Sequence, residues 1–262
     1  MRLVIKIGTS LLVDGQYRLD LDFLRNFAEK VAAIKQKGHE IVIVSSGAVA
    51  SGRSELRFEC ENKNIPCRQV LAAVGQGLLM KIYYDFFKKR GIAVAQALLT
   101  NYDFVNRENF LNTKNVFELL LKRGIVPIVN ENDVTAVAEL KFGDNDMLSA
   151  KTAAMVSADC LCIFTDVDGF FEEDPKNNPG AKLIPVVKKI DDAARRSAGG
   201  TCSLLSLGGM ITKLEAAQYV TSAGIPMFIL NGASVEAFEK LMKFCDGDFT
   251  VADKIGTFFP SG

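Results

Sequence analysis

The sequence predicts an α/β fold, a three-layer αβα sandwich in which helices cover both faces of a mainly parallel central sheet. Short apolar runs alternate with longer segments of helical periodicity along the chain. The 262 residues, 48% of them hydrophobic, are enough to bury a large core. The apolar runs also end repeatedly in small, polar or charged residues, which is typical of strands that carry a ligand site at their carboxyl ends.

In the first half of the chain, a strand is expected at residues 3–7 and a helix over 20–37. This helix is indicated by apolar residues at a spacing of three and four and by Gly38, which marks its end. The segment EIVIVS is the second expected strand. A helix should begin in SSGAVASG, and two more are expected over about 69–90 and 113–123, with strands at AVAQALL and IVPIVN.

In the second half, we expect a helix after GDND, a strand at CLCIFTD, a helix over about 209–223, a strand at PMFIL, a helix over 235–244 and a strand near FTVAD. The polar stretch 172–183 predicts a loop or hairpin. It separates an N-terminal lobe of about residues 1–158 from a C-terminal lobe of about 159–262. Because strands continue on both sides without a change in composition, we expect one domain over residues 1–262.

Composition and charge exclude several classes of function. The chain has 31 basic and 31 acidic residues, so no overall field recruits nucleic acid or an anionic membrane, and neither is expected as a partner. The N-terminus lacks the features of a signal peptide, which predicts a cytoplasmic protein. The six cysteines form no C-x-x-C pair and are expected to be buried, reduced thiols. His39 is the sole histidine, which argues against a histidine-based hydrolase or a multi-histidine metal site.

Lys6 lies inside the first strand, between two isoleucines and just before the turn Gly8-Thr9-Ser10. An ammonium buried on such a strand costs several kcal/mol unless it has an anionic partner. The alternative is that Lys6 snorkels from an edge strand into water. The position before a glycine turn favours a functional cation.

Two polar motifs could supply the partner and a binding site. In SSGAVASG, residues 45–52, a helix is expected to begin just after a glycine. The exposed main-chain N–H groups of such a helix start favour the binding of an anion. The alternative is that the small residues allow tight packing of the helix on the strand. NEND at 130–133 and GDND at 143–146 concentrate amides and carboxylates, although one aspartate of GDND could simply cap a helix. Such a mixture can hold both the ammonium and the carboxylate of an amino acid.

LGGMITKL, at 207–214, places two glycines before a helix that carries Lys213 in its first turn. Lysine is unfavourable there unless an anion such as phosphate is close, because the helix N-terminus is already partly positive. A solvated lysine on an exposed helix face is the alternative. Neither glycine cluster has the spacing of a P-loop or of a dinucleotide-binding fingerprint.

Two lysines, glycine turns and carboxylates together indicate phosphoryl transfer to a carboxylate. Two unit charges about 4 Å apart repel by about 1 kcal/mol in water and about 4 kcal/mol at an effective dielectric near 20, so flanking cations matter. A carboxyl group with a pKa near about 4.3 is already ionised at neutral pH and needs no general base. Mg²⁺ would bridge the nucleotide phosphates.

Taken together, these motifs resemble the amino acid kinase family. The matching segments are VIKIGTS, VSSGAVASG, NEND, FGDNDMLSA, TDVDGFF and GGMITKLEAA, which occur in the family's order between residues 4 and 217. The resemblance extends most closely to members that use ATP and Mg²⁺ to phosphorylate the side-chain carboxylate of L-glutamate, giving γ-glutamyl phosphate in the first step of proline biosynthesis. It implies the amino acid kinase fold.

The resemblance also implies roles for individual residues. Lys6 and Lys213 would stabilise the transferring phosphoryl group, with Asp146 orienting them. The glutamate-binding positions would be Ser46, Gly47, Asp133 and Asn145. The nucleotide-binding positions would be Lys6, Gly8, Ser10, Thr165, Asp166, Leu207, Gly208, Gly209, Met210, Ile211, Thr212 and Lys213. No protein ligand of a metal is assigned, L-proline is the expected feedback inhibitor, and a homodimer or homotetramer is expected.

Two departures from the family pattern and two alternatives accompany this interpretation. Ser206 and Leu207 replace a glycine and a threonine before the lysine turn, and the chain leaves no room for the C-terminal PUA domain of many members. A kinase of this fold for another acidic substrate, such as aspartate, N-acetylglutamate or a nucleoside monophosphate, is one alternative. A non-catalytic amino-acid sensor is the other.

Overall fold

The computed structural model describes residues 1–14, 18–56, 64–136, 145–175, 177–199 and 209–261. The chain divides into two compact units. Unit 1 comprises residues 1–6 and 143–262, and unit 2 comprises residues 7–142. The lobes expected from the sequence met at about residue 158, whereas the units change at residue 143, because helix α7 (Asn145–Met155) packs on helix α9 (Met210–Ser222). The single domain stays a prediction.

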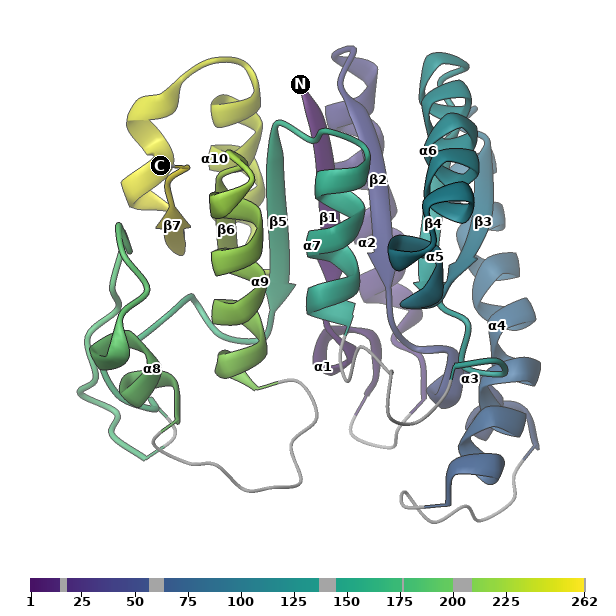
Figure 1. The fold of residues 1–262 in the computed structure, drawn as a ribbon, viewed down its shortest axis with the longest axis horizontal. Coiled ribbons are helices and arrows are strands. Elements are labelled where there is room, and N and C mark those ends of the chain that lie inside the picture. The colour runs from purple at the N-terminus through teal and green to yellow at the C-terminus, as the bar shows by residue number, and fades with distance from the viewer. Residues whose placement is uncertain (15–17, 57–63, 137–144, 176, 200–208, 262) are drawn as a thin grey trace. The chain divides into compact units, whose positions relative to one another are not determined.

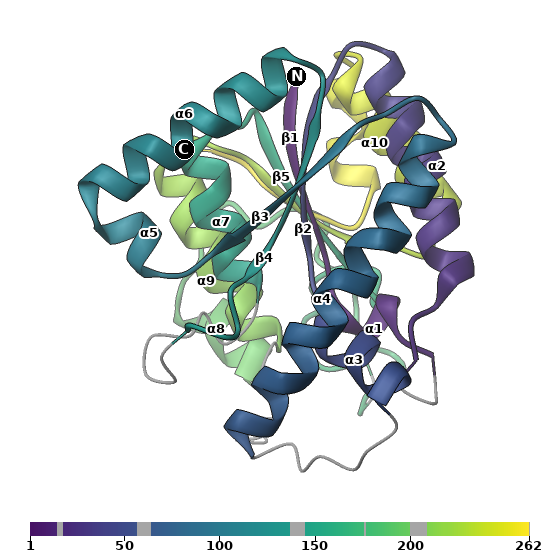
Figure 2. The same cartoon turned by 90° about the vertical axis from the view of Figure 1, so that its right-hand side faces the viewer.

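Unit 1 contains the strands β1 (Arg2–Ile7), β5 (Cys160–Thr165), β6 (Met227–Asn231) and β7 (Thr257–Phe259), adjacent in the order β1-β5-β6-β7. β5 and β6 are parallel, and β7 runs antiparallel to β6. Figure 2 shows α7 and α9 on one face of these strands and α10 (Val235–Cys245) on the other. Leu3, Val4, Ile5 and Ile7 of β1 have no exposed surface, which is why this strand carries an almost unbroken apolar run.

The prediction of one strand in unit 1 is wrong. FTVAD belongs to a 3₁₀ helix, Phe249–Lys254, and the strand β7 begins later, at Thr257. Asp248 explains the difference, because its Oδ1 accepts hydrogen bonds from Thr250 N at 3.2 Å and from Thr250 Oγ1 at 2.6 Å. Such local bonds let an aspartate start a helical turn even where β-branched residues follow. Gly256, with φ of +57°, then turns the chain into β7.

The remaining elements of unit 1 are a short helix and a hairpin. Helix α8 (Asp192–Gly199) was not expected from the sequence, since it is short and its only apolar side chains are alanines. The stretch 172–183 is closed by an antiparallel bridge between Phe171 and Leu183, which confirms the expected hairpin for the residues described there.

Unit 2 contains the parallel strands β2 (Glu40–Ser45), β3 (Val94–Leu99) and β4 (Val126–Glu131), adjacent in the order β3-β4-β2. Figures 1 and 2 show α2 (Leu21–Gln36) and α4 (Ile65–Lys88) on one face of these strands and α5 (Tyr102–Val105) and α6 (Arg107–Lys122) on the other. Helix α1 (Thr9–Leu12) follows β1, and α3 (Ala48–Leu56) follows β2. The α/β class, the mainly parallel strands and the helices on both faces are thus confirmed.

Asparagine caps set the starts of two helices in unit 2. The side chain of Asn64 accepts a hydrogen bond from Cys67 N, and the side chain of Asn106 accepts one from Asn109 N. The helices α4 and α6 therefore begin several residues before the starts expected at about 69 and 113. The apolar periodicity becomes visible only where a helix meets the core, whereas the cap determines where the helix begins.

The helices α3 and α4 cross at unusually close range through two glycines. A Cβ placed on Gly75 would lie 1.9 Å from Ala48 O and 2.3 Å from Gly52 N, and one placed on Gly52 would lie 2.0 Å from Leu71 O. The second glycine of SSGAVASG thus serves helix packing. Gly47, with φ of +103°, instead lets the chain turn between β2 and α3.

We expect Gly75→Ala to lower the free energy of unfolding by about 3 kcal/mol or more, because backbone atoms of α3 cannot move aside cheaply. Gly77→Ala is the matched control in the same helix, where an added Cβ meets nothing within 4 Å. It should be neutral or stabilise by up to about 1 kcal/mol, since alanine favours the helix. Urea unfolding of both variants measures the difference, and equal stabilities would contradict the close crossing.

The cysteines partly follow expectation. Cys160, Cys162 and Cys245 are buried free thiols, as expected. Cys67 takes part in a disulfide bond, so the expectation of reduced thiols is wrong for this residue. Cys60 and Cys202 lie outside the described residues.

Among the residues that the structure describes, no helix combines the length and the apolar character that crossing a bilayer requires.

Candidate active site

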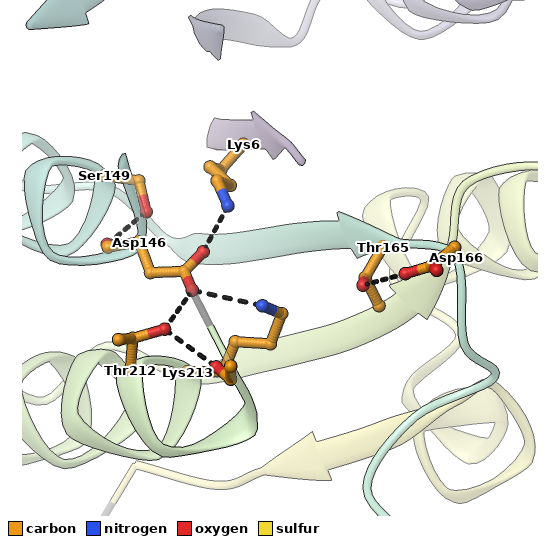
Figure 3. A network of polar contacts seen from close by, with 8 residues as sticks. Lys6, Asp146, Ser149, Thr165, Asp166, Thr212 and Lys213 are labelled. Carbon is orange, nitrogen blue, oxygen red and sulfur yellow. Dashed lines mark hydrogen bonds and ion pairs between the residues drawn. The ribbon is translucent and has the colours of Figure 1, made fainter. Parts of the chain in front are cut away.

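Lys6 is buried on β1 with 1% of its surface exposed, so the snorkelling interpretation is wrong. Its Nζ lies 2.5 Å from Oδ1 of Asp146, and Figure 3 shows the side chain pointing at that carboxylate. The anionic partner that the strand position demanded is thus a carboxylate from a segment 140 residues along the chain, within the same unit.

Asp146 occupies the first turn of α7 and is fully buried. A carboxylate is favoured in this place, because the N-terminal end of a helix carries partial positive charge. The hydroxyl of Ser149 donates to the main-chain oxygen of Asp146 at 2.6 Å, which ties the turn together. The side chain of Asp146 is directed at two lysines.

Lys213 lies in the first turn of α9 with 6% of its surface exposed, so it is not a solvated lysine. Its Nζ donates to Oδ2 of Asp146 at 3.2 Å. Lys6 and Lys213 therefore contact different oxygens of one carboxylate, as Figure 3 shows. The sequence predicted that the two amines converge, and the contacts within unit 1 confirm it.

Thr212 adds a third contact to the same carboxylate. Its Oγ1 lies 2.8 Å from Oδ2 of Asp146 and also 2.8 Å from the main-chain oxygen of Gly209. The hydroxyl has a single proton, and the charged acceptor forms the stronger hydrogen bond. We therefore assign the donation to Asp146, which links the glycine turn ahead of α9 to the lysine pair.

The pKa of Asp146 is set by opposing effects. Burial alone would raise the pKa of this carboxyl, but the charges of Lys6 and Lys213 and the hydrogen bonds from Lys6 and Thr212 outweigh it and hold the pKa at about 2. The carboxylate therefore stays ionised at every pH at which the protein is expected to work. Because the folded-state pKa lies below the ordinary value of 3.8, ionisation of Asp146 stabilises the fold above that value, and this stability is lost as pH falls through about 2.

We expect Thr212→Val to lower the free energy of unfolding at neutral pH by about 1.5–3 kcal/mol, because it removes a hydrogen bond to a charged group without changing the volume. The pKa of Asp146 should rise, so the difference from the wild-type protein should shrink as pH falls from 3.8 towards 2. Thr212→Ser keeps the donor and should restore most of the loss. Acid titrations of stability would contradict the assignment if the deficit were independent of pH.

Thr165 and Asp166 stand at the carboxyl end of β5, where Thr165 Oγ1 donates to Asp166 Oδ1 at 3.1 Å (Figure 3). Two further side chains, Asp168 and Asn231, hold the loop behind them, and Asn231 is one of the polar residues that follow the expected strands. Asn231 Nδ2, at the end of β6, donates to Asp168 Oδ1 at 2.8 Å, and Gly232 N donates to Thr165 O at 2.9 Å. These bonds join the carboxyl ends of two adjacent parallel strands, which is where ligands bind in such sheets.

The glycine-rich turn is only partly described. Gly209 caps α9 from an extended conformation, and Met210, Ile211, Thr212 and Lys213 form its first turn. Leu207 and Gly208 lie outside the described residues, as do Ser206 and Gly143.

The other residues expected in binding sites lie in both units. In unit 2, Gly8 caps α1 with exposed Ser10 behind it, and buried Ser46 and Gly47 follow β2. Asp133 lies in the turn after β4, where its main-chain oxygen accepts a hydrogen bond from Gln69 Nε2 at 3.0 Å. Asn145 is the first residue of α7 in unit 1 and is 8% exposed.

Chemically, the core of unit 1 holds two ammonium groups against one carboxylate, next to the N-terminal turns of two helices. Both ammonium groups and both helix ends favour an anion with several negative charges. A transferring phosphoryl group fits such a site, because charge neutralisation and alignment are most of what its transfer requires.

Sequence comparison agrees with this chemistry. Residues 1–231 match the amino acid kinase family over most of the chain. The chain belongs to the amino acid kinase family.

Among relatives of this family, glutamate 5-kinase from Caldanaerobacter subterraneus is 40% identical over 259 residues, which are 99% of this chain and 68% of that protein. Glutamate 5-kinase from Geobacter metallireducens is 45% identical, with 88% of this chain and 62% of the relative covered. Glutamate 5-kinase from Clostridium acetobutylicum is 42% identical, and the match covers 93% of this chain and 91% of that protein. The chain thus spans between about two thirds and nine tenths of the length of these relatives.

Solved structures support the fold. An isopentenyl phosphate kinase is 19% identical with a TM-score of 0.68, covering 99% of this chain and 100% of the other. UMP kinase from Bacillus anthracis is 17% identical with a TM-score of 0.63, covering 99% and 96%. At these identities the likeness concerns the amino acid kinase fold, and the fold expected from the sequence is confirmed.

Proposed function

We propose that this amino acid kinase transfers the γ-phosphoryl group of ATP to the side-chain carboxylate of L-glutamate, yielding γ-glutamyl phosphate and ADP in the first step of proline biosynthesis. The observation that carries the proposal is the convergence of the Lys6 and Lys213 ammonium groups on the buried carboxylate of Asp146. The names and identities of the relatives support glutamate as the acceptor.

In the proposed reaction, an oxygen of the glutamate carboxylate attacks the γ-phosphorus while the bond to the oxygen that bridges the β- and γ-phosphates breaks. The bridging electron pair leaves with ADP, and no proton has to move, because the nucleophile is already ionised. The obstacle is the repulsion between the carboxylate and the phosphates. Lys6 and Lys213 offset it with fixed positive charge, and Asp146 holds both ammonium groups in place.

The proposed role of Mg²⁺ is to accompany ATP. Among the described residues, no three histidine, cysteine or acidic side chains gather into a metal-binding group. The described side chains therefore fit an ion that is held mainly by nucleotide phosphates and water, which is the usual arrangement for Mg²⁺ in kinases. When bound, Mg²⁺ neutralises phosphate charge.

For the nucleotide, we propose Lys6, Gly8, Ser10, Thr165, Asp166 and residues 207–213 as binding positions. The carboxyl end of β5 and the helix start at Gly209 support the proposal, because both are places where main-chain groups bind phosphate or ribose. For glutamate, we propose Ser46, Gly47, Asp133 and Asn145. The place of Ser46 and Gly47 directly after the carboxyl end of β2 supports the proposal, because ligands bind at such strand ends.

The function is tested with purified protein, ATP, Mg²⁺ and glutamate. ADP should form only when glutamate is present, and hydroxylamine should trap the acyl phosphate as a hydroxamate. A panel of aspartate, N-acetylglutamate and nucleoside monophosphates checks the acceptor. Turnover with a panel member but not with glutamate would overturn the proposed substrate. Binding of glutamate or proline without any binding of an ATP analogue in calorimetric titration would indicate a sensor.

Three further expectations belong to this proposal. L-proline should inhibit the reaction in competition with glutamate, the protein should be a homodimer or homotetramer, and it should act in the cytoplasm. The resemblance to the family supports the first two. Initial rates at varied proline and glutamate, and sedimentation of the purified chain, measure the first two.

A further inference from the structure

Unit 2 contains a pocket of about 310 Å³, at the lower end of the size range of sites for small molecules. It is lined from α4, from β3, from the start of α3 and from the turn after β4. Its polar lining residues are Gln76, Gln96, Glu131, Asn132 and Asp133. The wall therefore combines amide donors with carboxylates.

The orientation of the Gln76 amide is determined by a chain of hydrogen bonds. The main-chain N–H of Glu131 donates to Oδ1 of Asn130 at 2.9 Å, so the Asn130 amide group must present Nδ2 on its other side. Asn130 Nδ2 donates to Oε1 of Gln76, also at 2.9 Å. The acceptor of Gln76 is thus used, and its Nε2 is left to donate elsewhere.

Gln76 Nε2 has no hydrogen-bond partner among the residues that the structure describes, although Gln76 is only 8% exposed and lines the pocket. A buried amide donor without an acceptor destabilises the protein that carries it. This donor therefore has room for an acceptor that the described residues do not supply.

We propose that Gln76 is a substrate-binding residue whose Nε2 donates to the α-carboxylate of the amino-acid substrate. The inference rests on the proposed function and extends it to the recognition of the non-reacting end of glutamate. That end is the one suited to an enclosing wall, because the reacting carboxylate must stay open to the phosphoryl donor. The carboxylates of Glu131 and Asp133 on the same wall match the α-ammonium group.

The variant Gln76→Glu tests the proposal, because it keeps an acceptor for Asn130 Nδ2 and replaces the donor by a negative oxygen. The KM for glutamate should rise at least about tenfold, which corresponds to about 1.4 kcal/mol, while the KM for ATP should stay within about twofold. Gln36→Glu, at the exposed end of α2 in the same unit, is the control for added charge and should change neither.

A substrate analogue separates a direct contact from a structural effect. The compound 4-aminobutyrate has the reacting carboxylate and the amine of glutamate but lacks the α-carboxylate. The wild-type protein should prefer glutamate strongly, and Gln76→Glu should reduce this preference at least about tenfold, because the new charge repels the α-carboxylate, which only glutamate carries.

The possible results distinguish the two proposals. If the wild-type protein neither binds nor phosphorylates glutamate, the proposed function fails. If the wild-type protein phosphorylates glutamate but Gln76→Glu keeps both its KM and its preference over 4-aminobutyrate, the function stands and the role of Gln76 is overturned, with water as the partner of Nε2. A loss of preference in the variant supports the contact.

Discussion

Replacement of Lys6 by alanine is expected to lower kcat by about a thousandfold while the KM values change by less than about tenfold, because a fixed charge at the transferring group acts mainly on the transition state. The protein should remain folded, since Lys213 and Thr212 still contact Asp146. Lys6→Arg should also be impaired, because the planar guanidinium cannot occupy the place of a compact ammonium 2.5 Å from Oδ1. Steady-state kinetics of the glutamate-dependent release of ADP measure both variants.

The control for Lys6→Ala is Lys243→Ala, which removes an exposed lysine from α10 and should leave kcat unchanged. Circular dichroism and urea unfolding establish that each variant is folded. Near-normal turnover of Lys6→Ala would mean that Lys6 serves only as a counter-ion of Asp146, and the proposed role in phosphoryl transfer would be lost.

Asp146→Asn should have the largest effect on stability, with a loss of about 3–5 kcal/mol in the free energy of unfolding at neutral pH. The variant removes a fully buried carboxylate that contacts the ammonium groups of Lys6 and Lys213. The side chains of these two lysines are 1% and 7% exposed. The deficit should vanish as pH falls through about 2, where the wild-type carboxyl becomes protonated as well. Urea unfolding at a series of pH values measures it.

Asp85→Asn is a matched control, because Asp85 pairs with Lys81 at 2.7 Å on the surface of α4, with 46% and 70% of the side chains exposed. An exposed pair contributes less than about 1 kcal/mol. If Asp146→Asn were no more destabilising than this control, the burial of the charge cluster would be refuted. Asp146→Asn should also lower kcat, since Lys6 and Lys213 are then no longer oriented by a carboxylate.

Sequence reasoning located most elements because the chain is locally consistent. The strands carry apolar runs, and helix ends carry glycines or capping residues at the positions where the structure begins and ends them, as at Asp20 before α2. It failed at FTVAD, because β-branched residues predict a strand while the Asp248 side chain stabilises a helical turn. It missed α8, since this helix is short and has no apolar side chain larger than alanine.

In the site, sequence reasoning identified Lys6, Asp146 and Lys213 because lysines within an apolar strand and a helix start are out of place unless an anion is near. Gln76 was missed, although a signal existed. It replaces an apolar residue in the buried stripe of α4 that includes Ala72, Leu79 and Tyr83. Asn231 belongs to the polar strand ends that the sequence indicated, but its contact with Asp168 gave no signal, because it joins segments that are far apart in the chain.

The sequence by itself determined the alternation of strands and helices and the need for a counter-ion at Lys6, because propensity and the cost of burying charge depend on residue type and near neighbours. Only the tertiary structure decided that one carboxylate serves both lysines through different oxygens, that Thr212 shares it, and which amide nitrogen of Gln76 is left without a partner. These features depend on distances between side chains from separate elements, and such distances follow from packing rather than from local sequence.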